Sequence, residues 1–267
     1  MSSWLNYLRT HRFPHIWCAG CGNGTVINAM ARAAEDLKLN KDKTSVVSGI
    51  GCSSRGSGYL DCCTLHTTHG RALPFATGLK FANPELEVLV VSGDGDATAI
   101  GGNHFIHAAR RNIDLTLVIM NNNIYGMTSG QYSPLTPTGA LATTAPYGNI
   151  DRTFDICKLA EASGATYVAR ATSYHVSLLK KCIENGIKNK GFSVIEVLTQ
   201  CPTYFGRRNK IGNAPQMLRW YKDRGVLWKP GTKEDPDKIY LGEFVNVTDS
   251  EYCESYEAVI EKAGGKK

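Results

Sequence analysis

The stretch GDGDATAIGGNHFIHAARRNIDLTLVIMNNNIYG, which runs from Gly93 to Gly126, decides how the fold is interpreted. The apolar run 88–92 that leads into it predicts a buried strand, residues 101–111 predict a helix, and residues 115–120 predict the next strand. A strand, a helix and a second strand joined by short turns are typical of a parallel sheet. Residues that follow the two strands therefore meet at one edge of the sheet, where such folds bind their ligands.

Two oxygen donors fall at this edge. Asp94 follows the first strand and Asn122 follows the second. Magnesium accepts a carboxylate and a carboxamide while it also binds substrate phosphates, and the backbone carbonyl of Ile124 can add a third ligand. The pattern GDG followed by NN resembles the motif of proteins that bind thiamine diphosphate. Each half alone is an ordinary loop turn, so the interpretation depends on the pair.

Composition and charge limit the kind of molecule. The chain has 267 residues, 42% of them hydrophobic, which is enough for one large α/β domain. No apolar run approaches the ~20 residues of a membrane span, and the N-terminus lacks a signal-peptide hydrophobic region, so we expect a cytoplasmic protein without a membrane segment. The net charge of +6 favours anionic ligands or an acidic partner over nucleic acid.

Strand and helix patterns alternate along the chain as far as residue 200. We expect further helices at 25–37, 74–81, 155–162 and 176–188, and further strands at 45–50, 167–170 and 192–198. Residues 129–149 are rich in Thr, Pro, Gly and Ser, which predicts a long functional loop. The expected fold is therefore α/β, with a parallel sheet and helices on both faces over 1–200. An irregular C-terminal extension over 201–267 is expected to pack on this domain or on a partner.

Nine cysteines in a cytoplasmic chain favour metal binding, redox chemistry or buried thiols over disulfides. Cys18 and Cys21 form a C-x-x-C turn, while Cys52 and Cys201 each follow a predicted strand at the ligand edge. Four such thiolates can hold a four-iron, four-sulfur cluster or a structural zinc ion, and spacing alone does not choose between them. We expect the remaining cysteines to be small buried thiols. These are Cys62, Cys63, Cys157, Cys182 and Cys253.

The motifs together resemble one protein family. The chain carries, in this order, WCAGCGNG, GIGCSSRG, HGRALPFATGLKFANP, GDGD, NNNIYGMTSGQ and CPTYFGRRN. These are similar to the β subunits of 2-oxoacid:ferredoxin oxidoreductases, especially the branch that acts on 2-oxoglutarate, over roughly residues 14–225. The resemblance implies oxidative decarboxylation of a 2-oxoacid, with coenzyme A capturing the acyl group and ferredoxin removing the electrons.

The resemblance also implies the cofactors. These are thiamine diphosphate, held through Mg²⁺ by Asp94, Asn122 and the Ile124 carbonyl, and one [4Fe–4S] cluster, which selects iron and sulfur over zinc. The implied cluster ligands are Cys18, Cys21, Cys52 and Cys201. The other expected cofactor contacts are Gly51, Ser53, Ser54, His69, Gly93, Gly95, Asp96, Tyr125, Gly126, Met127 and Thr128.

A partner α subunit is implied as well. A carboxylate must activate the aminopyrimidine ring of the cofactor, yet the motifs quoted above contain no Glu. The family resemblance implies that the α subunit supplies it. Ser129 departs from the family pattern, in which Gly is common and some broad-specificity relatives carry Lys. This departure leaves pyruvate or a broad range of 2-oxoacids as alternatives to 2-oxoglutarate.

Three side chains are candidates for contact with the substrate. Arg55 and Arg71 suit the distal carboxylate of a dianionic 2-oxoacid, because a guanidinium binds a carboxylate at two points. A structural ion pair or a subunit contact explains either arginine equally well. His69 either contacts the diphosphate, polarises the substrate, or is a hydrogen-bonded structural histidine.

Two other classes of function remain open from the sequence. A non-redox thiamine diphosphate decarboxylase or synthase would not need the four placed cysteines. An electron-transfer or assembly subunit would not need the magnesium motif.

Overall fold

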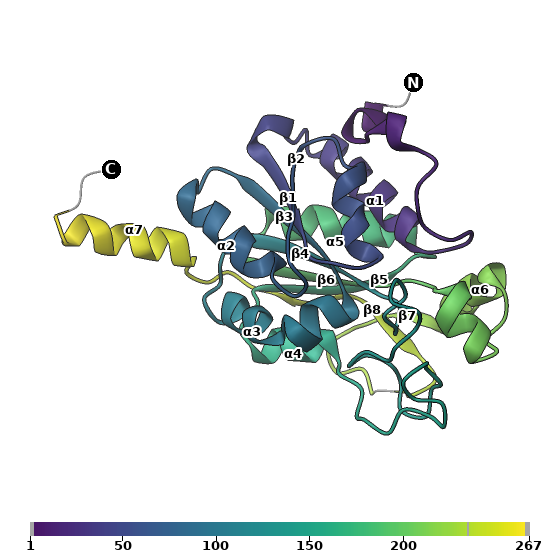
Figure 1. The fold of residues 1–267 in the computed structure, drawn as a ribbon. Coiled ribbons are helices and arrows are strands. Elements are labelled where there is room, and N and C mark those ends of the chain that lie inside the picture. Colours follow the sequence, from purple (N-terminus) through teal and green to yellow (C-terminus); the bar gives the residue numbers. More distant parts are fainter. Residues whose placement is uncertain (1–2, 234, 265–267) are drawn as a thin grey trace.

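The computed structural model describes residues 3–233 and 235–264. The strands are β1 (Thr44–Ser48), β2 (Cys63–His66), β3 (Glu87–Gly93), β4 (Leu115–Asn121), β5 (Tyr167–Thr172), β6 (Phe192–Leu198), β7 (Gly225–Leu227) and β8 (Ile239–Asn246). The α-helices are α1 (Asn23–Asp36), α2 (Ala72–Ala82), α3 (Gly102–Arg110), α4 (Ile156–Ala162), α5 (Val176–Lys188), α6 (Ala214–Arg224) and α7 (Tyr252–Lys262). Figure 1 shows one sheet with α1 and α5 on one face and α2, α3 and α4 on the other, while α6 and α7 lie at opposite ends of the molecule.

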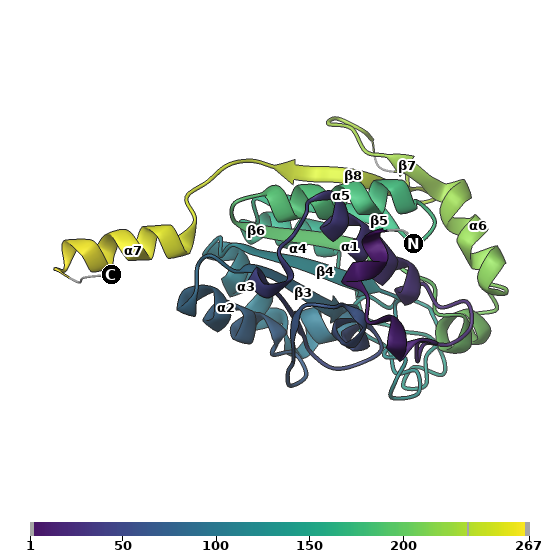
Figure 2. The ribbon, with the colours of Figure 1, turned by 90° about the horizontal axis from the view of Figure 1, so that it is seen from above.

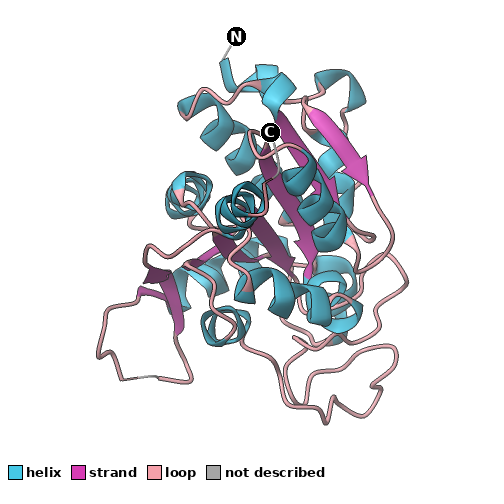
Figure 3. Cartoon of the chain, turned by 90° about the vertical axis from the view of Figure 1, so that its left-hand side faces the viewer, coloured by secondary structure: helices cyan, strands magenta, loops and turns pink. Residues whose placement is uncertain are grey.

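The sheet has the strand order β2-β1-β3-β4-β6-β5-β8-β7. Neighbouring strands from β2 to β5 are parallel, whereas β8 pairs antiparallel with β5. Figure 3 shows the sheet flanked by helices, with long loops extending from its lower part. The α/β fold with a mainly parallel sheet confirms the expectation from the sequence.

Both faces of the sheet are apolar because consecutive side chains of a strand point to opposite faces. Val46 and Val91 pack on one face with residues of α1 and α5. Val47 and Val90 pack on the other face with residues of α2, α3 and α4. Buried strands of this kind read as continuous hydrophobic runs, which is why the central strands were predictable.

One edge strand escaped prediction. β2 has the sequence CTLH and is only partly buried, so it lacks the apolar run of the central strands. Cys63 in this strand is exposed, which shows that the expectation of a buried thiol was wrong at that position. Cys62 is half-buried, whereas Cys157, Cys182 and Cys253 are buried as expected.

The chain beyond residue 200 is more regular than its composition indicates. It contributes α6, the strands β7 and β8, of which β8 pairs antiparallel with β5 and β7 forms the edge of the sheet, and α7. In Figures 1 and 2, α7 extends away from the sheet at the opposite end of the molecule from α6. No helix among the described residues has the length and hydropathy needed to cross a membrane.

The order of the strands brings the predicted site residues together. β1, β3, β4 and β6 are neighbours and run in the same direction. The residues that leave their carboxyl ends lead to Cys52, Asp94, Asn122 and Cys201, respectively. Four segments far apart in the sequence therefore converge on one edge of the sheet.

Candidate active site at the carboxyl edge of the sheet

Asp94 is a buried carboxylate at the end of β3, with only 3% of its surface exposed. It accepts a hydrogen bond from Ser133 Oγ at 2.5 Å and others from backbone amides, including that of Asn122. No Lys, Arg or His within the described ranges forms an ion pair with it. Burial raises the pKa of Asp94 to about 7. A buried carboxylate without a cation is costly, so the site suits a divalent cation.

The turn after β4 brings a second oxygen donor beside Asp94. Asn122 is buried, and its Oδ1 accepts a hydrogen bond from the Ile124 amide at 3.2 Å. Asn123 has φ +63°, a left-handed conformation that Asn adopts more readily than most residues. Thr136 Oγ1 donates to the Asn123 carbonyl at 2.6 Å and braces the turn. The carboxylate, the carboxamide and the Ile124 backbone thus lie in one small region, as the sequence motif predicts.

A buried charge network that the sequence analysis missed supports this turn. Asn121 Nδ2 donates to Glu196 Oε1 at 2.7 Å, and Asn121 Oδ1 accepts from the Asn123 amide at 3.1 Å. Arg170 in turn donates to Glu196 and to Asp155, both at 2.6 Å. The signal in the sequence was a single Glu within the apolar strand FSVIEVL. A buried Glu needs a partner, and here the partners fix the turn that carries Asn122.

The same network contains a group of side chains with metal-ligand spacing. Asp155, Cys157 and Glu196 offer ligand atoms within 4.8 Å of one another. Arg170 already supplies the positive charge between the two carboxylates. We therefore interpret this group as a structural ion-pair network.

Asp96 ties three loops together. Its Oδ1 accepts from His69 Nδ1 at 2.5 Å, from the Gly70 amide at 2.7 Å and from the Ile50 amide at 3.2 Å, and its Oδ2 accepts from Ser92 Oγ at 2.6 Å. Because the carboxylate is occupied by these donors, Asp96 positions its neighbours in this structure. Its expected direct contact with the cofactor remains a prediction.

The glycines of the GDG motif are required by close contacts. A Cβ on Gly95 would lie 2.2 Å from the ring of Tyr125, whose hydroxyl donates to the Gly95 carbonyl at 3.1 Å. A Cβ on Gly93 would lie 2.7 Å from Ser53 Oγ. The His69 ring meets the Tyr125 ring edge-on, with centroids 6.0 Å apart. These contacts bring the loop after β1, the GDG turn and the loop after β4 into one wall.

The loop after β1, which forms part of this wall, has polar groups that are free to bind a ligand. The Ser54 hydroxyl is fully buried and has no hydrogen-bond partner within the described chain. A Cβ on Gly51, which has φ +118°, would meet open space. Together with the uncompensated Asp94, an unpaired hydroxyl and an open backbone fit a phosphate-bearing cofactor with its metal.

The four predicted cluster cysteines also meet at this edge. The Cys21 amide donates to the Cys18 carbonyl at 3.1 Å and closes the C-x-x-C turn. Gln200 holds that turn beside Cys201, since its Nε2 donates to the Gly20 carbonyl at 2.9 Å. Burial, with the neighbouring thiols Cys201, Cys52 and Cys18 adding to it, raises the pKa of Cys21 to about 12.

The four thiols do not form a tight group in this structure. Among the described residues, the group of metal-type ligands within 4.8 Å is Asp155, Cys157 and Glu196, and no three of the four cysteines come so close together. Tetrahedral zinc with Zn–S bonds of about 2.3 Å needs sulfurs only about 3.8 Å apart. The four thiols are therefore farther apart here than a tetrahedral zinc site requires.

One loop joins the two sites. The backbone amide of Met127 donates to the Cys52 thiol, and a Cβ on Gly126 would lie 3.4 Å from Cys52 Sγ. The preceding Tyr125 contacts the GDG turn through Gly95. Thr128, the next residue, instead donates to the side chain of Gln131 at 2.6 Å. Residues 125–127 thus contact the GDG turn at one end and Cys52, a predicted cluster ligand, at the other.

The two candidate substrate arginines differ in their surroundings. Arg55 is exposed and makes no hydrogen bond or ion pair with the described residues. Arg71 contacts His104 through its guanidinium, and burial together with this neighbouring charge lowers the pKa of His104. Arg55 is therefore the arginine that remains available to a ligand.

Comparison with known proteins agrees with this geometry. Residues 49–197 match the family described as "Thiamine pyrophosphate enzyme, C-terminal TPP binding domain". The 2-oxoglutarate synthase subunit KorB of Archaeoglobus fulgidus is 59% identical over 256 residues, which cover 96% of this chain and 94% of that protein. The KorB subunit of Methanothermobacter marburgensis is 51% identical over 267 residues, covering 98% and 94%.

A solved structure extends the comparison to three dimensions. The 2-oxoglutarate:ferredoxin oxidoreductase from Magnetococcus marinus, solved with 2-oxoglutarate, coenzyme A and succinyl-CoA bound, aligns with a TM-score of 0.89 at 32% identity. The alignment covers 98% of this chain and 91% of that one.

Fold and site define a thiamine diphosphate enzyme domain. More closely, the chain belongs to the β subunits of the 2-oxoacid:ferredoxin oxidoreductases, in the branch of the KorB subunits of 2-oxoglutarate synthase. The family and enzyme class expected from the motifs are confirmed.

Replacing Asn121 by Ala should weaken magnesium-dependent cofactor binding roughly tenfold, because outer partners of metal ligands typically have effects of this size. Calorimetry with Mg²⁺ and thiamine diphosphate measures the change. Asn185→Ala is a matched control. Asn185 also donates to a carboxylate, that of Glu243 at 2.6 Å, but this bond joins α5 to β8 and does not involve the turn that carries Asn122. Equal affinities of the Asn121 variant and the natural chain would show that the network does not position the turn.

Magnesium affinity should fall as the pH falls below about 7. The pKa of Asp94 is raised, so the metal-free fold holds a proton there that an unfolded chain would release. This proton contributes stability that is lost as the pH rises from about 4 towards 7. Because magnesium must displace the proton, its affinity should drop by up to tenfold per pH unit on the acid side.

Titrations between about pH 8 and about pH 6 test this dependence. Asp94→Asn, which has no proton to lose, should bind magnesium weakly with little dependence on pH. Tighter binding at the lower pH in the natural chain would contradict the assignment.

Proposed function

We propose that this chain forms, with a partner α subunit, the site at which 2-oxoglutarate is oxidatively decarboxylated to succinyl-CoA and carbon dioxide, with ferredoxin as the electron acceptor. The observation that carries the proposal is the shared loop 125–127, which contacts both the Asp94 turn and Cys52. A cofactor that releases electrons and a centre that receives them need to be close neighbours. The enzyme class of the relatives supports the same reaction.

Asp94, Asn122 and the Ile124 carbonyl would hold Mg²⁺, and the metal would hold the diphosphate of thiamine diphosphate. When bound, this cofactor supplies the carbon nucleophile that cleaves the bond to the 2-oxoacid carboxylate. The residues of this chain would bind the cofactor and orient it toward the 2-oxoacid. Ser54 offers its unpaired hydroxyl to an oxygen of the ligand, and the buried setting of Asp94 excludes competing water.

Cys18, Cys21, Cys52 and Cys201 would hold one [4Fe–4S] cluster. When bound, the cluster takes up electrons singly. The protein keeps the site close to the cofactor by contacts of the 125–127 loop, and it keeps Cys201 in place through the adjoining Gln200, which binds the C-x-x-C turn.

The site needs a partner to be complete. Of the carboxylates in the GDGD turn, Asp94 is expected to bind metal and Asp96 is occupied by four donors. Neither is available to activate the aminopyrimidine ring. We therefore assign this carboxylate to the α subunit, in agreement with the subunit names of the relatives.

The enzyme assembled from both subunits should reduce viologen or ferredoxin when 2-oxoglutarate and coenzyme A are both present. The isolated chain, loaded with both cofactors, should be inactive because it lacks the activating carboxylate. Turnover by the scrupulously purified chain alone would rule out a shared site. Release of carbon dioxide without reduction of an acceptor would instead indicate a non-redox enzyme.

Cys201→Ser should lose most of the iron and acid-labile sulfide, because one of four cluster ligands is removed. Cys62→Ser is the control, since Cys62 is half-buried and not part of the cysteine group. Chemical analysis and visible absorbance of anaerobically purified protein measure both. Iron loss in the control with normal iron in Cys201→Ser would reassign the ligand.

Arg55→Met should lower kcat/KM for 2-oxoglutarate roughly tenfold or more relative to pyruvate, because a charge-assisted contact with the distal carboxylate is worth about 1.5–3 kcal/mol. Arg71→Met is the comparison, since Arg71 already contacts His104. Assays of the assembled enzyme on both acids separate the cases. An equal fall on both acids would mean that Arg55 supports the cofactor or the subunit interface.

A further inference from the structure

Positive charge is concentrated on residues 207–224. This segment contains six cations and one acid, Asp223, so it carries a net +5 of the +6 of the whole chain. The six cations are Arg207, Arg208, Lys210, Arg219, Lys222 and Arg224. The remaining charges of the protein are almost balanced, which makes this segment electrostatically distinct.

Most of these cations have no partner among the residues that the structure describes. Arg207, Lys210, Arg219 and Lys222 are exposed and make no side-chain hydrogen bond or ion pair with any residue the structure describes. Arg208 is exposed and bonds only the Thr143 hydroxyl, at 3.3 Å. Unpaired exposed cations produce a positive potential that attracts an acidic partner.

The same segment covers the cysteine turn. A Cβ on Gly20 would lie only 2.3 Å from the Cβ of Ala214, so the turn and the start of α6 are in direct contact. A Cβ on Gly206 would lie 2.6 Å from Met217 Sδ, so α6 also packs on the turn after Cys201. At 1.5 Å per residue, Arg219 is about 8 Å along α6 from Ala214. The cations of α6 therefore lie on a helix whose first residue packs on the turn of the proposed cluster ligands.

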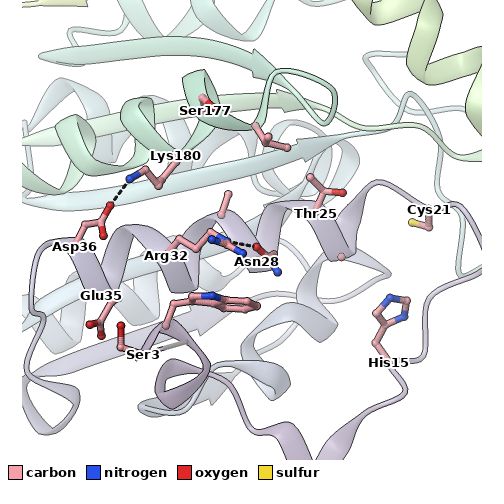
Figure 4. Close-up of a pocket in the computed structure, with 14 residues that line it drawn as sticks. Ser3, His15, Cys21, Thr25, Asn28, Arg32, Glu35, Asp36, Ser177 and Lys180 are labelled. Atoms are coloured by element: carbon pink, nitrogen blue, oxygen red, sulfur yellow. Dashed lines mark hydrogen bonds and ion pairs between the residues drawn. The ribbon is translucent and has the colours of Figure 1, made fainter. Parts of the chain in front are cut away.

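The cysteine turn also borders a cavity whose positive charges are balanced. A cavity of about 730 Å³ between α1, α5 and the N-terminal segment is lined in part by Cys21. Figure 4 shows its two cations beside polar partners: Lys180 pairs with Asp36, and Arg32 donates to Asn28 at 2.7 Å. Because its charges are matched, this cavity does not select an acidic protein.

We infer that residues 207–224 form the docking surface for a small acidic electron-carrier protein, which approaches the cluster past the exposed Cys18 turn. The inference rests on the proposed function, since it needs the cluster to be held by the four cysteines. Positive charge around the approach would steer the carrier and fix its orientation. Trp220, which lies between Arg219 and Lys222 and is exposed, offers an apolar contact once the partner is bound.

The test uses the enzyme assembled from both subunits and a small acidic [4Fe–4S] ferredoxin as the probe. The double variant Arg219→Glu, Lys222→Glu should raise both the Kd and the KM for ferredoxin roughly tenfold or more, and it should weaken their dependence on ionic strength. kcat with methyl viologen and the iron content should stay unchanged, because neither residue touches the cofactors.

The matched control carries the same change of charge at the opposite edge of the sheet. Arg110 and Lys188 end α3 and α5, close to the amino ends of β4 and β6, and both are exposed. Arg110→Glu, Lys188→Glu should leave the Kd and KM for ferredoxin unchanged. A milder variant, Arg219→Gln, Lys222→Gln, should weaken ferredoxin binding to a smaller degree and keeps the test valid if the Glu variant does not fold.

The inference is overturned if the neutral and acidic α6 variants bind ferredoxin as the natural enzyme does, or if the control loses as much affinity. Failure of folded α6 variants to join the α subunit would also overturn it, because the surface would then be a subunit contact. Absence of iron from the natural enzyme would refute the cluster. In that case the Kd for ferredoxin and its dependence on ionic strength would still show whether residues 207–224 form the docking surface.

Discussion

The burial of the Asp94 carboxylate is the constraint on which the rest of the site depends. Asp94 stands at the end of β3 without a cationic partner in the described chain, held by Ser133 and by backbone amides. Such a group is costly in a closed interior and becomes favourable when a divalent cation arrives. The network through Glu196 fixes the turn that carries Asn122, which is the second proposed ligand of that cation.

The parallel sheet also places the cysteines next to Asp94. The strand ends that deliver Asp94 and Asn122 also lead to Cys52 and Cys201, so the thiol group and the magnesium-type site must be neighbours. The short loop 125–127 contacts both sites. The fold therefore places the residues proposed to bind the cofactor next to the residues proposed to hold the cluster.

Residues at strand ends were predictable because the strands themselves are continuous apolar runs, and a parallel sheet aligns their carboxyl ends. This reasoning predicted the positions of Asp94, Asn122, Cys52 and Cys201, whereas Cys18 and Cys21 were predicted from their C-x-x-C spacing. It did not give the bonds of Glu196 to Arg170 and Asn121, or the contact of Arg71 with His104, since such pairings depend on side-chain directions across strands and helices. β8 was missed because its strand is only partly buried and joins the sheet antiparallel after a polar segment.

The most direct test of the account is diffraction from crystals of the cofactor-loaded complex at the iron absorption edge. We expect an anomalous iron peak among the sulfurs of Cys18, Cys21, Cys52 and Cys201, and a light cation bound by Asp94 and Asn122 across the 125–127 loop. An iron signal confined to another subunit, or a zinc signal among these four sulfurs, would contradict the claim that this sheet edge carries both cofactors.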